Sequence, residues 1–217
     1  YLVPGGNRFE DLQSGDFGFE IGVYLTSWPS FYDGSNQTPT DLDLGDVNGD
    51  GYADIVLGFG TDHFDNMDYD GVGNPDTTDG MVEIIHGASL ATLIEQQDNQ
   101  TWTSLLSPWG SLDADFGASI AVGDLNGDGY ADIVIGAPYA DEDNILANNG
   151  GAIYIIYGQA SLKINTYSSS GDGAYVPYDY GQFIQFSVLF SEFPDAHMGD
   201  AVTVGDFNGD GYMDYAT

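Results

Sequence analysis

The stretch Gly123-Asp124-Leu125-Asn126-Gly127-Asp128-Gly129-Tyr130-Ala131-Asp132 decides the fold of this chain, because it occurs three times. A first copy, Gly-Asp-Val-Asn-Gly-Asp-Gly-Tyr-Ala-Asp, occupies 45–54, and a third, Gly-Asp-Phe-Asn-Gly-Asp-Gly-Tyr-Met-Asp, occupies 205–214. Successive copies start 78 and 82 residues apart. Self-similarity at a long period is typical of repeat architectures. The chain is therefore predicted to be built from repeats.

Short strands are predicted on both sides of each copy. Before the copies, apolar residues alternate with other residues, and this period of two indicates a strand with one buried face; the pairs are Leu42 and Leu44, Ile120 and Val122, and Val202 and Val204. After the first two copies, continuous apolar runs at 55–57 and 133–135 favour strands buried on both faces.

Each repeat is predicted to contain four strands. A third strand is expected at 80–87 and 151–158, and a weaker fourth at 102–106 and 183–190. Four short antiparallel strands with Gly-rich turns describe a propeller blade, so the predicted fold class is all-β. The predicted boundaries are about 20–110 for repeat 1, 111–195 for repeat 2 and 196–217 for an incomplete repeat 3, with long loops at 61–79 and 161–180.

The repeated loops have the residue types of a calcium site. Calcium takes six to eight oxygen ligands, and side-chain oxygens fall at positions one, three, five and nine, with a backbone carbonyl expected at position seven. The predicted ligands are Asp46, Asn48, Asp50, Tyr52 and Asp54 in the first loop, Asp124, Asn126, Asp128, Tyr130 and Asp132 in the second, and Asp206, Asn208, Asp210, Tyr212 and Asp214 in the third. About three calcium ions are expected.

Two alternatives to a calcium loop share part of this pattern. An EF-hand needs a Glu at position twelve and flanking helices, but position twelve is Leu57, Ile135 or Thr217 and the flanks are predicted strands. Asp and Asn also make plain turns; three copies with every ligand position kept favour calcium over that alternative. The acidic stretch from Asp68 to Asp76 has similar spacing, although a solvated loop is the favoured interpretation there.

The second repeat resembles the FG-GAP repeat family, which includes the integrin α-subunit propeller. The resemblance rests on Phe116-Gly117, the loop at 124–132, Gly136-Ala137-Pro138 and the run 151–158. Repeat 1 has Thr38-Pro39 and Gly58-Phe59-Gly60 at the matching positions, and repeat 3 has Met198-Gly199. The resemblance implies a structural calcium ion in each loop and a ligand met on the opposite face of the propeller.

The composition limits the partners. With 35 acidic residues against Arg8 and Lys163, the net charge of −33 excludes nucleic acid or an anionic membrane bound through basic patches. A surface adapted to high salt is a second explanation of this acidity, compatible with calcium binding. The 42% hydrophobic content argues against disorder, and the absence of Cys excludes thiolate metal sites. No apolar stretch is long enough to span a bilayer.

No enzyme signature stands out, so the chain is predicted not to be an enzyme. His63, His86 and His197 show no zinc-ligand spacing, and His86 is interpreted as a packing position in a strand. The Gly-rich loops lack the Gly-Lys-Ser/Thr of a phosphate loop, and there is no Gly-x-Ser-x-Gly elbow. Asp113 and Asp115 could form a glycosidase-like pair, but such pairs arise by chance in an acidic chain.

Three functions therefore remain open. The preferred one is a calcium-stabilised extracellular or cell-surface module for adhesion to a protein or glycan. The second is a subunit of a structural assembly or filament, in which a homo-oligomer or further chain completes the propeller, since the third repeat is cut at Thr217. The third is the non-catalytic propeller of a larger hydrolase such as a phospholipase. Sequons at Asn36 and Asn99 and aromatic clusters at 28–32 and 175–180 are candidate glycan and binding sites.

Overall fold

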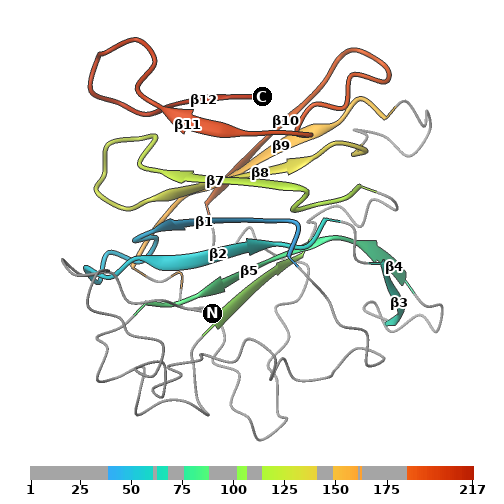
Figure 1. Ribbon diagram of the computed structural model, residues 1–217, viewed down its shortest axis with the longest axis horizontal. Coiled ribbons are helices and arrows are strands. Elements are labelled where there is room, and N and C mark those ends of the chain that lie inside the picture. Colours follow the sequence, from blue (N-terminus) through green and yellow to red (C-terminus); the bar gives the residue numbers. More distant parts are fainter. Residues whose placement is uncertain are drawn as a thin grey trace, which may run out of the picture.

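The computed structural model describes residues 39–60, 63–67, 76–87, 102–106, 114–140, 149–160, 162 and 185–217. Every regular element in these ranges is a β-strand, and the strands form two four-stranded and two two-stranded sheets (Figure 1). All strand pairs are antiparallel. The all-β prediction is confirmed. The described part contains no helix with the length and apolar character needed to cross a bilayer.

The two four-stranded sheets are propeller blades. Blade 1 has the order β1 (Asp41–Gly45), β2 (Asp54–Gly58), β5 (Met81–Ile85) and β6 (Trp102–Leu106). Blade 2 is the matching meander of β7 (Ser119–Gly123), β8 (Asp132–Ala137), β9 (Ala152–Ile156) and β10 (Phe186–Phe190). A third hairpin, β11 (Thr203–Gly205) with β12 (Asp214–Ala216), is called blade 3. The prediction of four antiparallel strands is therefore confirmed for blades 1 and 2.

Each repeated loop closes the hairpin between the first two strands of its blade. The pairs that flank the loops are Gly45 with Asp54, Gly123 with Asp132 and Gly205 with Asp214. Position nine of every loop is thus the first residue of the returning strand. We call residues 46–54 loop 1, 124–132 loop 2 and 206–214 loop 3.

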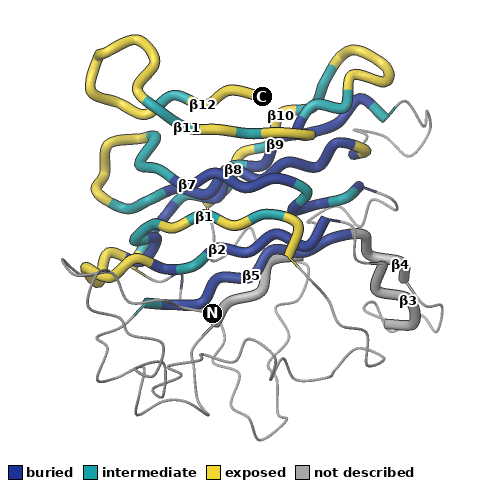
Figure 2. The backbone as a smooth tube through the Cα atoms, in the orientation of Figure 1, coloured by how far each residue is buried: buried dark blue, intermediate teal, exposed yellow. Residues whose placement is uncertain are grey.

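The main core lies between blades 1 and 2. Val56, Val82 and Ile84 of blade 1 share one buried cluster with Ile133, Ile135 and Tyr154 of blade 2, and with other residues of both blades. Figure 2 shows this buried layer in the middle of the molecule. A second cluster joins Ala121, Val134 and Ile153 of blade 2 to Val202 and Val204 before and within β11. Consecutive blades are therefore held together by apolar packing between their faces.

Glycines allow the blades to approach closely. A Cβ atom built on Gly58 would lie 2.1 Å from the carbonyl oxygen of Gly117, and one on Gly136 would lie 2.0 Å from that of Gly199. Gly117 and Gly199 have φ of +94° and +98°, a conformation that favours glycine. The Phe-Gly pair of repeat 2 thus packs on the Gly-Phe-Gly segment of repeat 1, and the Met-Gly pair of repeat 3 packs on the Gly-Ala-Pro segment of repeat 2.

The predicted buried face of the first strand is wrong for blade 1. Leu42 and Leu44 are 56% and 55% exposed, whereas Ile120 and Val122, at the same positions of blade 2, are 4% and 9% exposed. The face of β7 that carries Ile120 and Val122 packs on blade 1, which is the preceding blade. The matching face of β1 carries the two leucines and is directed away from blade 2. The opposite face of β1, which is directed toward blade 2, carries aspartates.

The long loop predicted at 61–79 contains a hairpin. β3 (His63–Met67) pairs with β4 (Asp76–Asp79), with a register irregularity between Phe64 and Met67. These segments are His-Phe-Asp-Asn-Met and Asp-Thr-Thr-Asp, in which no apolar alternation reveals a strand. The predicted repeat boundaries near 20, 110 and 111 lie outside the described residues, so the domain limits stay predictions.

Candidate metal-binding loops

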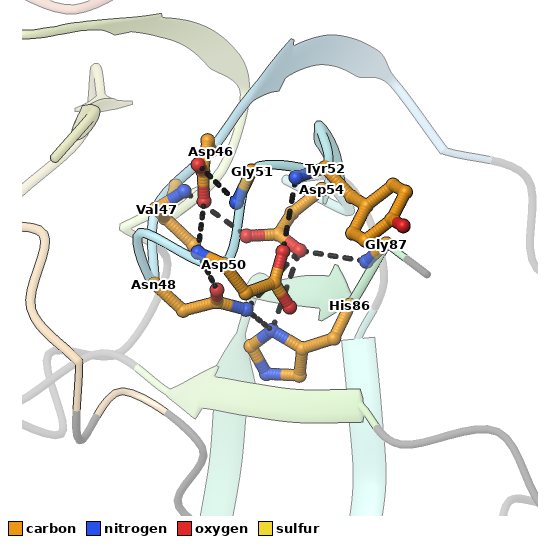
Figure 3. Close-up of polar contacts among 9 residues, drawn as sticks. All are labelled: Asp46, Val47, Asn48, Asp50, Gly51, Tyr52, Asp54, His86 and Gly87. Carbon is orange, nitrogen blue, oxygen red and sulfur yellow. Dashed lines mark hydrogen bonds and ion pairs between the residues drawn. The ribbon is translucent and has the colours of Figure 1, made fainter. Parts of the chain in front are cut away.

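The three loops lie at one end of the blades, each beside the next (Figure 1). In every loop the position-one aspartate folds back over the turn. Asp46 accepts hydrogen bonds from the backbone N–H groups of Asp50 (3.0 Å) and Gly51 (2.8 Å) (Figure 3). Asp124 and Asp206 make the same two bonds in loops 2 and 3. The glycine whose N–H donates the second bond has a φ of +87° to +93° in all three loops, which explains its recurrence.

Positions three and five continue the turn. Asn48 Oδ1 accepts the N–H of Asp50 at 2.9 Å, and Asp50 Oδ1 accepts the N–H of Tyr52 at 3.0 Å. Loops 2 and 3 repeat both bonds, with lengths of 2.8–2.9 Å. Each side chain bonds a backbone group two residues on, as Asn and Asp do in turns. The local sequence therefore dictates the loop shape directly.

Position nine anchors the loop to the blade. Asp54 Oδ2 accepts the N–H of Val47 at 3.0 Å and its Oδ1 accepts that of Gly87 at 2.7 Å, just beyond β5. In loop 2, Asp132 contacts Leu125 and Gly158 in the same way, at 2.9 Å each. Both carboxyl residues have 0% exposure. In loop 3, Asp214 accepts the N–H of Phe207 at 3.0 Å.

Burial changes the acidity of the position-nine carboxyl in loop 2. Loss of solvent raises the pKa of Asp132 above its ordinary value of 3.8, and the nearby charges of Asp128 and Asp124 raise it further. The backbone N–H donors of Gly158 and Leu125 oppose this change. The net effect is a raised pKa, which means that the ionised carboxylate is less stable in the folded chain than in water.

Loop 1 has an additional neighbour in His86. Its Nδ1 atom lies 3.1 Å from Asn48 Nδ2 and 3.6 Å from Asp54 Oδ1, and the imidazole is buried (Figure 3). His86 follows β5 directly rather than lying inside the strand. The packing interpretation misses this polar contact. In blade 2 the matching residue is Tyr157, whose hydroxyl lies 3.2 Å from that of Ser187 on β10.

The donor set of each loop fits a hard cation. A carboxylate offers about four lone-pair sites, and the hydrogen bonds above occupy only some of them. Carboxylate, amide and carbonyl oxygens are the ligands that calcium prefers. Within the described ranges, however, no three His, Asp or Glu side chains gather in a group that could hold a metal ion. The convergence of the predicted ligands on one ion stays a prediction.

Two aspartates that the sequence analysis did not single out join the blades. Asp41 Oδ2 accepts the N–H of Ile120 at 2.9 Å, and Asp43 Oδ2 accepts that of Val122 at 2.8 Å. The sequence did hold a signal, because Asp41 and Asp43 alternate with Leu42 and Leu44. Charged side chains on a strand face that becomes partly buried need hydrogen-bond partners, because burying an unpaired charge is costly.

Several predicted features lie outside the described residues. These are the sequons at Asn36 and Asn99, the acidic residues 68–75, Asp113, the aromatic clusters at 28–32 and 175–180, and the two basic residues Arg8 and Lys163. Asp76 lies on β4, for which only the backbone is described.

Comparison with known proteins supports the resemblance seen in the sequence. The family model of the FG-GAP repeat matches residues 116–156. Human integrin alpha-7 is 29% identical over 177 residues, covering 75% of this chain and 14% of that protein. Human integrin alpha-6 is 30% identical over 170 residues, covering 76% of this chain and 13% of that protein.

A shorter match is closer in identity. Integrin alpha ina-1 of Caenorhabditis elegans is 48% identical over 44 residues, which are 20% of this chain and 4% of that protein. The chain thus matches only a small part of each of these relatives. Residues 116–156 therefore belong to the FG-GAP repeat family, in a chain that is similar to integrin alpha subunits over three quarters of its length.

Proposed function

We propose that this chain is a calcium-binding FG-GAP propeller module in which each of the three loops holds one structural calcium ion. The observation that carries the proposal is the repetition of one hydrogen-bonded Asp-x-Asn-x-Asp arrangement in all three loops. Two of the loops also bury an aspartate completely, Asp54 and Asp132. A chain with only two basic residues has few other cations to offset such charges.

Calcium in these loops would stabilise the blades. The ligand positions span the junction of the first and second strands, so an ion joins both strands of the hairpin. Three divalent ions would also cancel six of the 33 net negative charges. A ligand that binds only the folded state stabilises it by about 2.7 kcal/mol per site at a concentration 100 times its Kd. Removal of calcium should therefore loosen the fold.

We further propose that the module is extracellular or cell-surface and acts in adhesion, binding a protein or glycan without catalysis. Its similarity to integrin alpha subunits supports this class of function. The predicted ligand surface is the face of the blades opposite the loops.

A second candidate function is a subunit of a larger assembly, and one observation favours it. Leu42 and Leu44 are more than half exposed on the face of β1 that corresponds to a covered face in blades 2 and 3. A further blade, from the same protein or from another copy, would cover them by the packing already seen between blades. Light scattering tests this: a mass above that of one chain supports a homo-oligomer, and a single-chain mass at all concentrations contradicts it.

Calorimetric titration of the chelator-stripped chain with calcium tests the main proposal. We expect about three ions per chain and a higher melting temperature in calcium than in chelator. A variant that carries Asp50→Asn, Asp128→Asn and Asp210→Asn should lose both effects. Asp200→Asn is a control that removes one charge at an exposed residue outside the loops, and it should keep both effects. No binding heat, with equal melting temperatures in calcium and chelator, would mean that the loops are only turns.

A further inference from the structure

Loops 1 and 2 are in direct contact through their backbones. The N–H of Ala131 in loop 2 donates a hydrogen bond to the carbonyl oxygen of Asp46 in loop 1, at 2.9 Å. Asp46 is the position-one ligand proposed for loop 1. Ala131 stands between Tyr130 and Asp132, which are positions seven and nine of loop 2. A change in the shape of one loop therefore reaches ligand positions in the other.

An aromatic ring makes a second contact between the same loops. A Cβ atom built on Gly49 would lie 2.4 Å from Tyr130 Cε1, so the ring of Tyr130 covers this glycine of loop 1. Gly49 lies between Asn48 and Asp50, two proposed ligands. The backbone carbonyl of Tyr130 is the proposed ligand at position seven of loop 2. One residue thus holds a proposed ligand position in its own loop and packs on the loop before it.

The contact recurs between loops 2 and 3. A Cβ atom on Gly127 would lie 2.8 Å from Tyr212 Cε1, again joining position four of one loop to position seven of the next. Gly209, the same position in loop 3, has a similar φ of +77° but no atom within 4 Å of such a Cβ. The ring contact is therefore a feature of the interface between blades and not of the loop itself.

We propose that the three loops load calcium cooperatively, with the position-seven tyrosine carrying the coupling; this rests on the proposed calcium function. An ion that fixes the carbonyl of Tyr130 also fixes its ring on Gly49, and so orders loop 1 before its own ion arrives. When the first ion has already ordered a loop, the second ion binds without that loss of conformational entropy and therefore binds more tightly. The coupling is reciprocal, so an ion in loop 1 equally favours loop 2.

Loop-specific variants measure this coupling in the otherwise intact chain. In the double variant Asp128→Ala, Asp210→Ala, loop 1 is the only intact loop. In the double variant Asp50→Ala, Asp210→Ala, loop 2 is the only intact loop. The single variant Asp210→Ala leaves both. Calorimetry gives the two single-loop constants and the overall two-ion constant. We expect the overall constant to exceed the product of the single ones by at least about fivefold, the lower end of typical allosteric coupling.

Changes at Tyr130 identify the carrier without removing a ligand, because its proposed ligand is a backbone atom. Each change at Tyr130 is added to the Asp210→Ala chain and to the two single-loop variants. With Tyr130→Ala, the ratio of the overall constant to the product of the single-loop constants should fall close to one. With Tyr130→Phe, this ratio should be retained. Tyr52→Ala is the matched control, since Tyr52 holds position seven of loop 1 with a 46% exposed side chain, and it should also retain the coupling. Circular dichroism should show unchanged strand content in Tyr130→Ala.

The outcomes separate the two proposals. An overall constant equal to the product of the single constants overturns the coupling and leaves calcium binding standing. Coupling that survives Tyr130→Ala but disappears in about 0.5 M salt, where charges more than a few ångströms apart are screened, also overturns it, because electrostatics then replaces the ring contact. No binding heat in any variant overturns the calcium function itself.

Discussion

The carboxylate of Asp43 on β1 accepts a hydrogen bond from the backbone N–H of Val122 on β7, with 2.8 Å between Oδ2 and the nitrogen. Asp41 does the same for Ile120 at 2.9 Å. The other oxygen of each carboxylate accepts the N–H of the next residue in β1, Leu42 or Leu44. Two aspartates therefore bridge the facing edges of the first strands of blades 1 and 2. The same positions of β7 are Ser119 and Ala121, which carry no carboxylate; there the hydroxyl of Ser119 donates instead to the carbonyl oxygen of Gly199, at 2.7 Å.

We predict that Asp43→Ala lowers the free energy of unfolding by about 1–3 kcal/mol, because a partly buried N–H loses a charged acceptor. Urea unfolding in saturating calcium measures the change while the loops stay filled. Asp200→Ala removes the same charge at an exposed position and should change the stability by less than about 0.5 kcal/mol. Equal stability of Asp43→Ala and the wild type would show that water replaces the carboxylate at no cost.

Close approach between blades gives a second prediction. A Cβ on Gly136 would lie 2.0 Å from the Gly199 carbonyl oxygen, a backbone atom that cannot turn away. Gly136→Ala should therefore destabilise the chain by at least about 1–3 kcal/mol through overpacking. Gly123→Ala, in the same blade, is the control: its Cβ would meet only side-chain atoms, the nearest being Cγ2 of Val204 at 3.1 Å, followed by Cγ of Met213 at 3.6 Å. A smaller loss at Gly136 than at Gly123 would contradict the packing described between blades 2 and 3.

The loops were the most predictable part of this molecule, because their shape is set by residues within nine positions of each other. Asp124, Asn126 and Asp128 bond backbone groups of the same turn. The strands around the loops were equally clear from apolar spacing, and the weak fourth strand predicted at 102–106 is β6. Local sequence is sufficient where local hydrogen bonds determine the structure.

Contacts between blades could not be predicted in the same way. Period-two spacing shows that Leu42 and Leu44 share a face, but not which neighbour covers it. In blade 2 the equivalent Ile120 and Val122 are covered by blade 1, and in blade 1 the leucines are exposed. The bond of Asp41 to Ile120 joins residues 79 positions apart. Such pairs depend on the arrangement of whole blades, which no short pattern encodes.

Phe116 of the Phe-Gly pair provides a third prediction. Its ring is 1% exposed and meets that of Tyr154 edge to face, with centroids 5.1 Å apart. Phe116→Ala should lower the free energy of unfolding by about 3–5 kcal/mol, the usual cost of removing a buried aromatic side chain. Phe207→Ala is the matched control, since Phe207 is 61% exposed, and should cost far less. Similar losses for both variants, measured by thermal unfolding in calcium, would contradict the core position of Phe116.

The raised pKa of Asp132 makes stability depend on pH in the calcium-free chain. Its folded pKa lies above 3.8, so the stability gained by protonating it is fully present below pH 3.8 and is lost as pH rises through the folded value. Asp132→Asn is neutral throughout this range. In chelator, the unfolding free energy of Asp132→Asn minus that of the wild type should therefore increase as pH rises from below 3.8 to neutral.

Calcium should shift this difference in unfolding free energy in favour of the wild type, because Asp132→Asn lacks a proposed carboxylate ligand of loop 2. At neutral pH, saturating calcium is expected to stabilise the wild type more than Asp132→Asn, by up to about 2.7 kcal/mol for one site at 100 times its Kd. Denaturant unfolding across pH, with chelator and with calcium, measures both effects. A difference between the two chains that stays constant with pH in chelator would mean that burial does not penalise the ionised carboxylate. Equal calcium stabilisation of both chains would mean that Asp132 is an anchor of the loop and not a ligand.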